Sequence, residues 1–142
     1  MTYLVDVLAP GHPLYPEDRV KRAIIDRILY FDAGSLNPVQ ADAFYGIFVG
    51  VPTNEEKRKV FVDKMSILDK MIGDKRYVTG DEKTLADLSL LATLVAAEAV
   101  HVDLSPWANV ERWYRGMRAE IDYDDWNVES IEGLRAYISK SK

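Results

Sequence analysis

The sequence has 142 residues, no cysteine and a formal net charge of −5, from 18 basic and 23 acidic side chains. The absence of cysteine excludes disulfides, thiolate metal sites and cysteine nucleophiles, and the acidic balance argues against a nucleic-acid partner. No apolar run approaches the ~18 residues that cross a bilayer, and the N-terminus does not resemble a secretory signal. With 48% apolar and 29% charged residues, we expect one soluble, cytoplasmic domain with no membrane partner.

The first residues are expected to form a short apolar helix followed by a linker. Residues 2–8 are mostly apolar, whereas residues 10–16 contain three prolines and a glycine, which excludes a continuous helix. A long helix is predicted to start at about Asp18. Its buried face is predicted from apolar residues at three- and four-residue spacing: Val20, Ala23, Ile24, Ile28 and Phe31.

Gly34 and Pro38 interrupt this helical pattern. Proline inside a helix removes a hydrogen bond and costs about 3 kcal/mol unless neighbours compensate, so we expect a kink between these two residues. The helix is predicted to resume over residues 41–49 and to end before Pro52.

A capping box at residues 53–56, starting at Thr53, predicts the beginning of the next helix. Gly73 is expected to end that helix. Its buried stripe is predicted to contain Val60, Phe61, Met65, Leu68 and Ile72.

The segment Tyr77–Leu94 is the most informative part of the sequence. A glycine turn leads to Thr84, which can cap a helix and form a reciprocal capping box with Asp87. From Leu85 to Val100 few side chains are polar, so this helix is expected to be buried at the centre of the domain. Because backbone donors would satisfy Asp87, a structural role is favoured over a catalytic base.

Two more helices are expected, at about residues 110–121 and 128–138, after a loop at residues 103–106. The predicted fold class is therefore all-α, a bundle of about five to six helices. His12 and His101 lie far apart in a sequence without cysteine, so no metal site is expected.

Three segments, in the same order, resemble the C-terminal helical domain of cytosolic glutathione S-transferases, in particular the insect delta and epsilon classes. They are the capping-box segment Tyr77–Leu94, the linker and first long helix over Leu14–Leu36, and the Asn-Val-Glu-Arg-Trp-Tyr run at Asn109–Tyr114. Together the motifs span most of the chain. The resemblance implies that residues 14–142 form a helical bundle of the glutathione S-transferase C-terminal type.

The resemblance also implies that residues 1–13 are a remnant of the last helix of a thioredoxin-like domain, plus the linker. In the family, that domain binds glutathione and supplies the catalytic residue, so no catalytic residue is implied in this chain. Glutathione is implied as a co-substrate only if that domain is supplied, and otherwise no cofactor. Without a sheet to pack on, the first helix is expected to expose Tyr3, Leu4 and Val7.

The segment after the expected kink is the strongest candidate for ligand binding, because its aromatic side chains offer stacking area to flat apolar molecules. The resemblance places Asn37, Tyr45 and Val49 at pocket-lining positions, although the delta class usually carries an aromatic residue in the place of Asn37. The candidate substrate-binding residues are Asn37, Phe44, Tyr45, Phe48, Val49 and Trp126. The alternative is that Phe44, Tyr45 and Phe48 pack in the core.

Two functions are therefore considered. In the first, the helical domain binds apolar electrophiles for glutathione conjugation, as in the detoxification of xenobiotics, and this chain alone is catalytically incomplete. In the second, the chain is a non-catalytic ligand-binding or protein-interaction module of the same type. A truncated product that only folds is a third alternative. The expected partners are apolar small molecules, a second copy of the chain and a thioredoxin-like domain.

Overall fold

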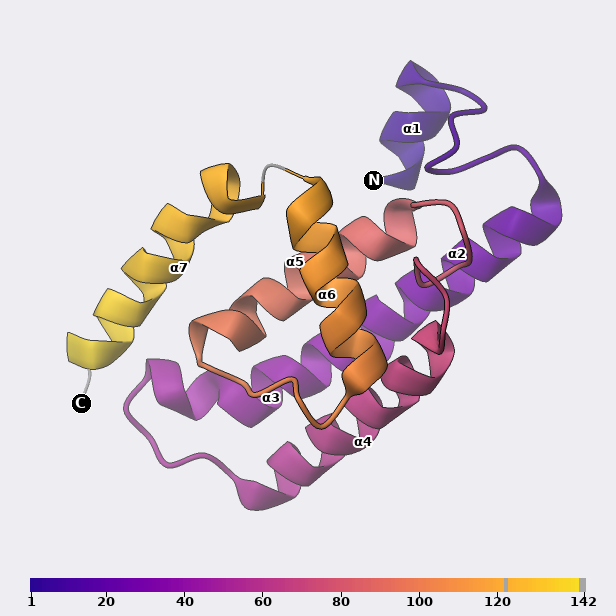
Figure 1. Cartoon of the computed structure of the whole chain (residues 1–142). Coiled ribbons are helices and arrows are strands. Elements are labelled where there is room, and N and C mark those ends of the chain that lie inside the picture. The colour runs from indigo at the N-terminus through magenta and orange to yellow at the C-terminus, as the bar shows by residue number, and fades with distance from the viewer. Residues whose placement is uncertain (122, 141–142) are drawn as a thin grey trace.

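The computed structural model describes residues 1–121 and 123–140, without the side chains of residues 123–126 and 140. This part of the chain is all-helical, with six α-helices after the linker, which confirms the predicted fold class (Figure 1). No helix in it is both long enough and apolar enough to span a bilayer. The elements are α1 Thr2–Leu8, α2 Arg19–Phe31, the π-helical turn η1 Asp32–Leu36, α3 Asn37–Phe48, α4 Glu55–Ile72, α5 Leu85–Ala99, α6 Ala108–Glu120 and α7 Tyr123–Lys140.

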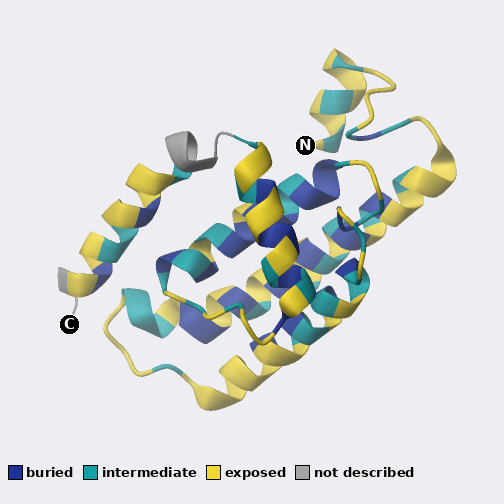
Figure 2. Ribbon diagram, viewed as in Figure 1, coloured by how far each residue is buried: buried dark blue, intermediate teal, exposed yellow. Residues whose placement is uncertain are grey.

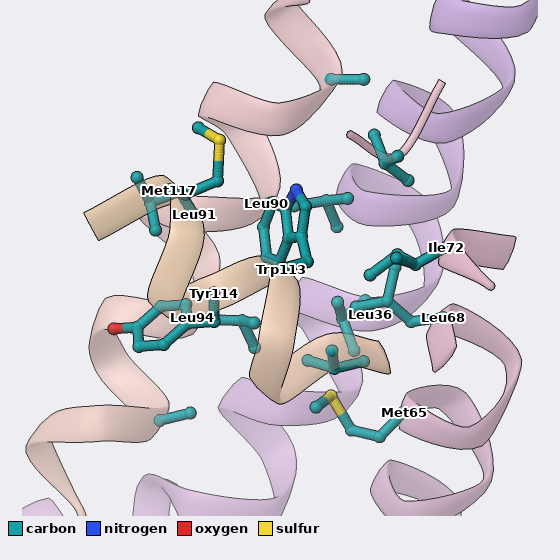
Figure 3. Close-up of a cluster of buried hydrophobic side chains, with 14 of the residues drawn as sticks. Leu36, Met65, Leu68, Ile72, Leu90, Leu91, Leu94, Trp113, Tyr114 and Met117 are labelled. Carbon is teal, nitrogen blue, oxygen red and sulfur yellow. The ribbon is translucent and has the colours of Figure 1, made fainter. Parts of the chain in front are cut away.

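Helix α5 is the centre of the bundle, as its apolar sequence predicted. Nine of its 15 residues are buried, and it packs against α2, α6 and α7 (Figure 2). Helix α4 packs against α3 and α6 on the other side of the core. Figure 3 shows Trp113 of α6 between Leu90 of α5 and the side chains of Leu68 and Ile72 of α4. Burial of this apolar surface is the main contribution to stability.

The buried face of α2 differs from the one predicted. Ile25 and Ile28 are buried, whereas Val20 is 70% exposed and Ile24 is also exposed. Helix α2 carries two overlapping apolar stripes, and the one centred on Ile25, Ile28 and Leu29 faces α5. Ile28 was predicted correctly, whereas Val20 and Ile24 lie on the outside of the molecule and the buried Ile25 was missed.

The predicted interruption between Gly34 and Pro38 is a π-helical turn at Asp32–Leu36. A π turn adds one residue to a helical turn, so the chain passes from α2 to α3 without a break. Pro38 then lies in the first turn of α3, directly after the π turn. The same turn buries Asp32 and Leu36 against the bundle.

The predicted bounds of two helices need correction. Helix α4 is capped by Asn54, whose side chain accepts hydrogen bonds from the backbone N–H groups of Glu56 and Lys57, and not by Thr53. It ends at Gly73 as predicted, but Val60 is exposed and does not belong to its buried stripe. Helix α7 begins at Tyr123, several residues before the expected start.

The linker is fastened to α2 by polar contacts. The Tyr15 hydroxyl donates to Asp26 at 2.9 Å, and the Arg22 guanidinium lies over the Tyr15 ring, 4.4 Å from its centre. Arg22 also forms an ion pair with Asp6 of α1, at 2.5 Å. Helix α1 itself buries no residue, and the expected exposure of its apolar residues is confirmed for Tyr3, Leu4 and Val7.

Candidate functional site

The carboxylate of Asp87 is the most heavily hydrogen-bonded buried group near the start of α5. Both bonds of its capping box with Thr84 are present, and the backbone N–H of Thr84 donates to it at 2.9 Å. The backbone N–H of Val78 and the indole N–H of Trp113 also donate, each at 2.9 Å. With its oxygens occupied by protein donors, Asp87 holds α5, α6 and the loop before α5 together and is not placed to act as a base.

A second carboxylate, Glu120, fixes the same loop from the end of α6. It accepts from the Tyr77 hydroxyl at 2.6 Å and from Arg76 at 2.7 Å, and Lys83 lies 3.7 Å away. The hydrogen bonds from Tyr77 and Arg76 hold the pKa of Glu120 below its ordinary value. In turn, the hydrogen bond to Glu120 raises the pKa of Tyr77. This network is structural, because it connects a loop to a helix end.

The structure does not bring the candidate substrate-binding residues together. Phe44 is buried and packs edge-to-face on Phe61, with ring centres 5.0 Å apart. Tyr45 is 65% exposed and, with Val49, lines a small hollow of about 240 Å³ between α3 and the start of α4. Phe48 is half-buried against the core.

The two remaining candidates lie elsewhere. The Asn37 side chain is directed at α5, where its amide donates to the Thr93 hydroxyl at 3.4 Å. The side chain of Trp126 lies outside the described residues. Tyr45 and Val49 are therefore the two candidates that share a hollow.

Buried polar groups fill part of the interface between α5 and the preceding helices. The Ser89 hydroxyl donates to Asp32 at 2.5 Å, and the Gln40 amide donates to the backbone carbonyl of Thr93 at 2.7 Å. One oxygen each of Asp32 and Gln40 is buried without a partner among the described residues. These contacts align α3 with α5 and so set the positions of their ends, where a hollow lies.

We call the hollow where these helices meet α7 the α3–α5–α7 hollow; its volume is about 660 Å³, within the range of small-molecule sites. It lies between the ends of α3 and α5 and the last turns of α7. Its apolar lining residues include Ile47, Val51, Val100 and Ile138, and its charged or polar ones are Arg135, His101 and Ser139. A cavity of this composition suits an apolar molecule with one polar group.

Gly46 shapes the wall of this hollow. The backbone N–H of Val51 donates to the Gly46 carbonyl at 2.8 Å, which folds the loop after α3 back against the helix. A Cβ atom on Gly46 would lie 2.6 Å from the carbonyl oxygen of Val51, closer than van der Waals contact permits. Glycine is therefore required at position 46 for the close approach of the Val51 carbonyl to the helix. Val51 and Pro52 line both the α3–α5–α7 hollow and the smaller hollow beside Tyr45, and they separate the two.

Sequence reasoning missed Gly46, His101, Ile138 and Arg135 as parts of a site. Gly46 was the one with a usable signal, because a glycine within an apolar helical segment often marks a close backbone approach. His101 follows the end of α5 and Arg135 lies in α7, and no spacing within the sequence connects them. Among the described residues, no group of three or more histidine or acidic side chains is arranged to hold a metal ion.

Known proteins match this chain along nearly its whole length. The sequence model of the family described as "Glutathione S-transferase, C-terminal domain" matches residues 52–116. Glutathione S-transferase D6 of Drosophila melanogaster is 30% identical over 142 residues, which cover 99% of this chain and 66% of that protein.

Solved structures give the same result. A delta-class glutathione transferase of Nilaparvata lugens superposes with a TM-score of 0.90 at 36% identity, over 99% of this chain and 67% of its own. Glutathione transferase BmGSTD1 of Bombyx mori superposes with a TM-score of 0.89 at 27% identity, over 96% of this chain and 65% of its own.

The fold is thus the helical domain of the glutathione S-transferase C-terminal type. The chain belongs to the glutathione S-transferase family, and it spans about two thirds of the length of these relatives.

Proposed function

We propose that this chain binds the apolar electrophile in a glutathione transferase reaction. The group that activates glutathione would lie in the third of the relatives' length that these residues do not span, in a thioredoxin-like domain. The chain would then contribute orientation of the electrophile and exclusion of water, which lower the barrier only when the thiolate is supplied next to it.

The proposal is supported by one observation above all: this chain of the glutathione S-transferase family contains the α3–α5–α7 hollow, which is large enough for a small molecule. Its apolar wall supports binding by burial of apolar ligand surface, worth roughly 25 cal/mol per Å² removed from water. Tyr45 and Val49 lie on the other side of the Val51–Pro52 wall, so an aromatic side chain is available at the edge of the site. Asp87 has its oxygens occupied by protein donors and supports no role in activating a thiol.

A second candidate function is a non-catalytic binding or protein-interaction module. The observation that favours it is helix α1, which buries none of its residues and exposes Tyr3, Leu4, Val7 and Leu8. Apolar residues are also exposed on α2, among them Val20 and Tyr30. They support a protein-interaction module and also a homodimer. We place both modes in the cytoplasm, in keeping with the proposed detoxification of apolar compounds.

Calorimetric titrations of the purified chain with 1-decanol and with glutathione test the proposal. We expect saturable binding of decanol and no binding of glutathione at millimolar concentration. Val51 is exposed in the free chain, so Val51→Asp should lower the affinity for decanol at least tenfold, because bound decanol would cover the new charge and remove it from water. Val62→Asp, on an exposed part of α4, is the matched control and should bind decanol normally.

Failure of the native chain to bind decanol would contradict the ligand site and favour the interaction module. Saturable binding of glutathione would contradict the proposal that glutathione binds to a thioredoxin-like domain and not to these residues.

A further inference from the structure

One guanidinium in the wall of the α3–α5–α7 hollow has an N–H group without an acceptor among the described residues. Arg135 of α7 donates from Nη2 to the backbone carbonyl of Glu98 at 3.1 Å. Its Nε is buried and has no hydrogen-bond partner within the described part of the chain. By contrast, the neighbouring Arg118 forms an ion pair with the Glu98 carboxylate at 2.8 Å, and Arg115 forms one with Glu111 at 2.6 Å.

A buried N–H without an acceptor is costly, roughly 1–3 kcal/mol, and more when the group is charged. The guanidinium is planar and always charged, and it offers its N–H donors in the geometry that a carboxylate oxygen pair accepts. Among the described residues, none supplies such a carboxylate to Arg135. An anionic group bound in the hollow would supply an acceptor to this guanidinium, which lines the wall.

His101 gives an independent observation in the same wall. It follows the C-terminal end of α5 with φ of 58°, the one non-glycine residue with positive φ among those described. The N–H of His101 bonds to the carbonyl of Glu98, and that of Val102 to the carbonyl of Ala97, which is the helix ending that usually has glycine at this position. A residue held in this costly conformation often has a functional role, and here it places an imidazole beside Arg135.

Apart from Ser139, the other side chains that line the α3–α5–α7 hollow are apolar. Ile47 of α3, Val100 after α5 and Ile138 of α7 are among them. Its volume of about 660 Å³ accommodates a medium-length hydrocarbon chain or one or two aromatic rings.

We propose that the α3–α5–α7 hollow selects apolar molecules that carry one carboxylate. The apolar body lies against Ile47, Val100 and Ile138, and the carboxylate accepts hydrogen bonds from Arg135 and a ring N–H of His101. This inference rests on the proposed function, since it names the class of molecule that the same site prefers.

Calorimetric titration with decanoate and 1-decanol, below their aggregation concentrations and near neutral pH, tests this inference. The two probes have the same chain length and differ in the anionic group. We expect the native chain to bind decanoate roughly tenfold or more tightly than decanol. Arg135→Gln should remove this preference, so that the variant binds decanoate about as tightly as decanol, and a far-UV circular dichroism spectrum like that of the native chain verifies that it is folded.

Two further variants define the source of the preference. Arg58→Gln removes the same charge from the exposed start of α4 and should retain the preference of the native chain. Arg135→Lys keeps the charge but not the planar set of donors, and should retain only part of the preference.

Equal binding of the two probes by the native chain would overturn the inference and leave the proposed function standing. If Arg58→Gln lost as much decanoate affinity as Arg135→Gln, the inference would also be overturned, because the preference would then reflect the net charge of the protein. Binding of neither probe would overturn the inference together with the proposed function.

Discussion

At the scale of single residues, Asp87 joins three parts of the chain through one carboxylate. It accepts from Val78 in the loop, from Thr84 at the start of α5 and from Trp113 of α6. Asp87→Ala leaves these buried donors unpaired, so we expect the free energy of unfolding to fall by at least about 3 kcal/mol in denaturant titrations. Asp63→Ala, on the exposed side of α4, is the control and should change it by no more than about 0.5 kcal/mol. Equal midpoints for the two variants would rule out this role of Asp87.

His101 predicts opposite effects on stability and on binding. Glycine adopts positive φ without the steric cost that histidine meets, so His101→Gly should raise the free energy of unfolding by about 1 kcal/mol. The same variant loses the imidazole and should bind decanoate more weakly than the native chain. Thermal unfolding and calorimetry check the two effects, and a variant that is less stable would contradict the account of this helix end.

At the scale of elements, the ends of α3 and α5 form the site, and Gly46 decides where the loop after α3 lies. Gly46→Ala places a Cβ atom against the Val51 carbonyl, so we expect a loss of about 1–3 kcal/mol of stability and weaker binding of decanol. Gly133→Ala in α7 is the matched control, since a Cβ there meets no atom within 4 Å. Replacing a helical glycine by alanine should stabilise that variant by roughly 0.5–1 kcal/mol. If both variants gained stability, the close approach at Gly46 would be refuted.

The sequence predicted elements whose signals are local. The capped, apolar helix α5 and the end of α4 at Gly73 were predicted correctly, because caps and hydrophobic composition act within a few residues. The buried face of α2 was predicted only in part. Ile28 was included, but two apolar stripes overlap, and only packing against α5 selects Ile25 over Val20 and Ile24.

The candidate site was harder to predict for the same reason. Phe44 and Tyr45 are adjacent aromatic residues, yet one is buried against Phe61 and the other faces outward. Their sequence gives no periodicity that distinguishes these directions over so short a stretch. The α3–α5–α7 hollow is lined by His101, after α5, and by Arg135 of α7. These residues are far apart in the sequence, and only the tertiary fold brings them to one wall.

At the scale of the whole molecule, stability depends on the pH through Glu120. Its folded-state pKa lies below its ordinary value of 4.5, so its contribution to stability is present above that value and is lost as the pH falls through the folded pKa. We expect the free energy of unfolding to fall below about pH 4.5, and Glu120→Gln to show a smaller fall over this range than the native chain. Chemical unfolding at a series of pH values measures this difference. Identical pH profiles would show that the network around Glu120 contributes nothing to acid stability.

We propose that the residues of this chain bind the apolar molecule and that glutathione binds outside them. Amide NMR titration of the isotope-labelled chain tests this proposal most directly. Adding 1-decanol should shift amide signals around the α3–α5–α7 hollow, at Gly46, Val51, Val100 and Ile138, in a saturable manner. Adding millimolar glutathione to the same sample should shift none of them. Saturable shifts with glutathione, or decanol shifts confined to other parts of the chain, would contradict the account.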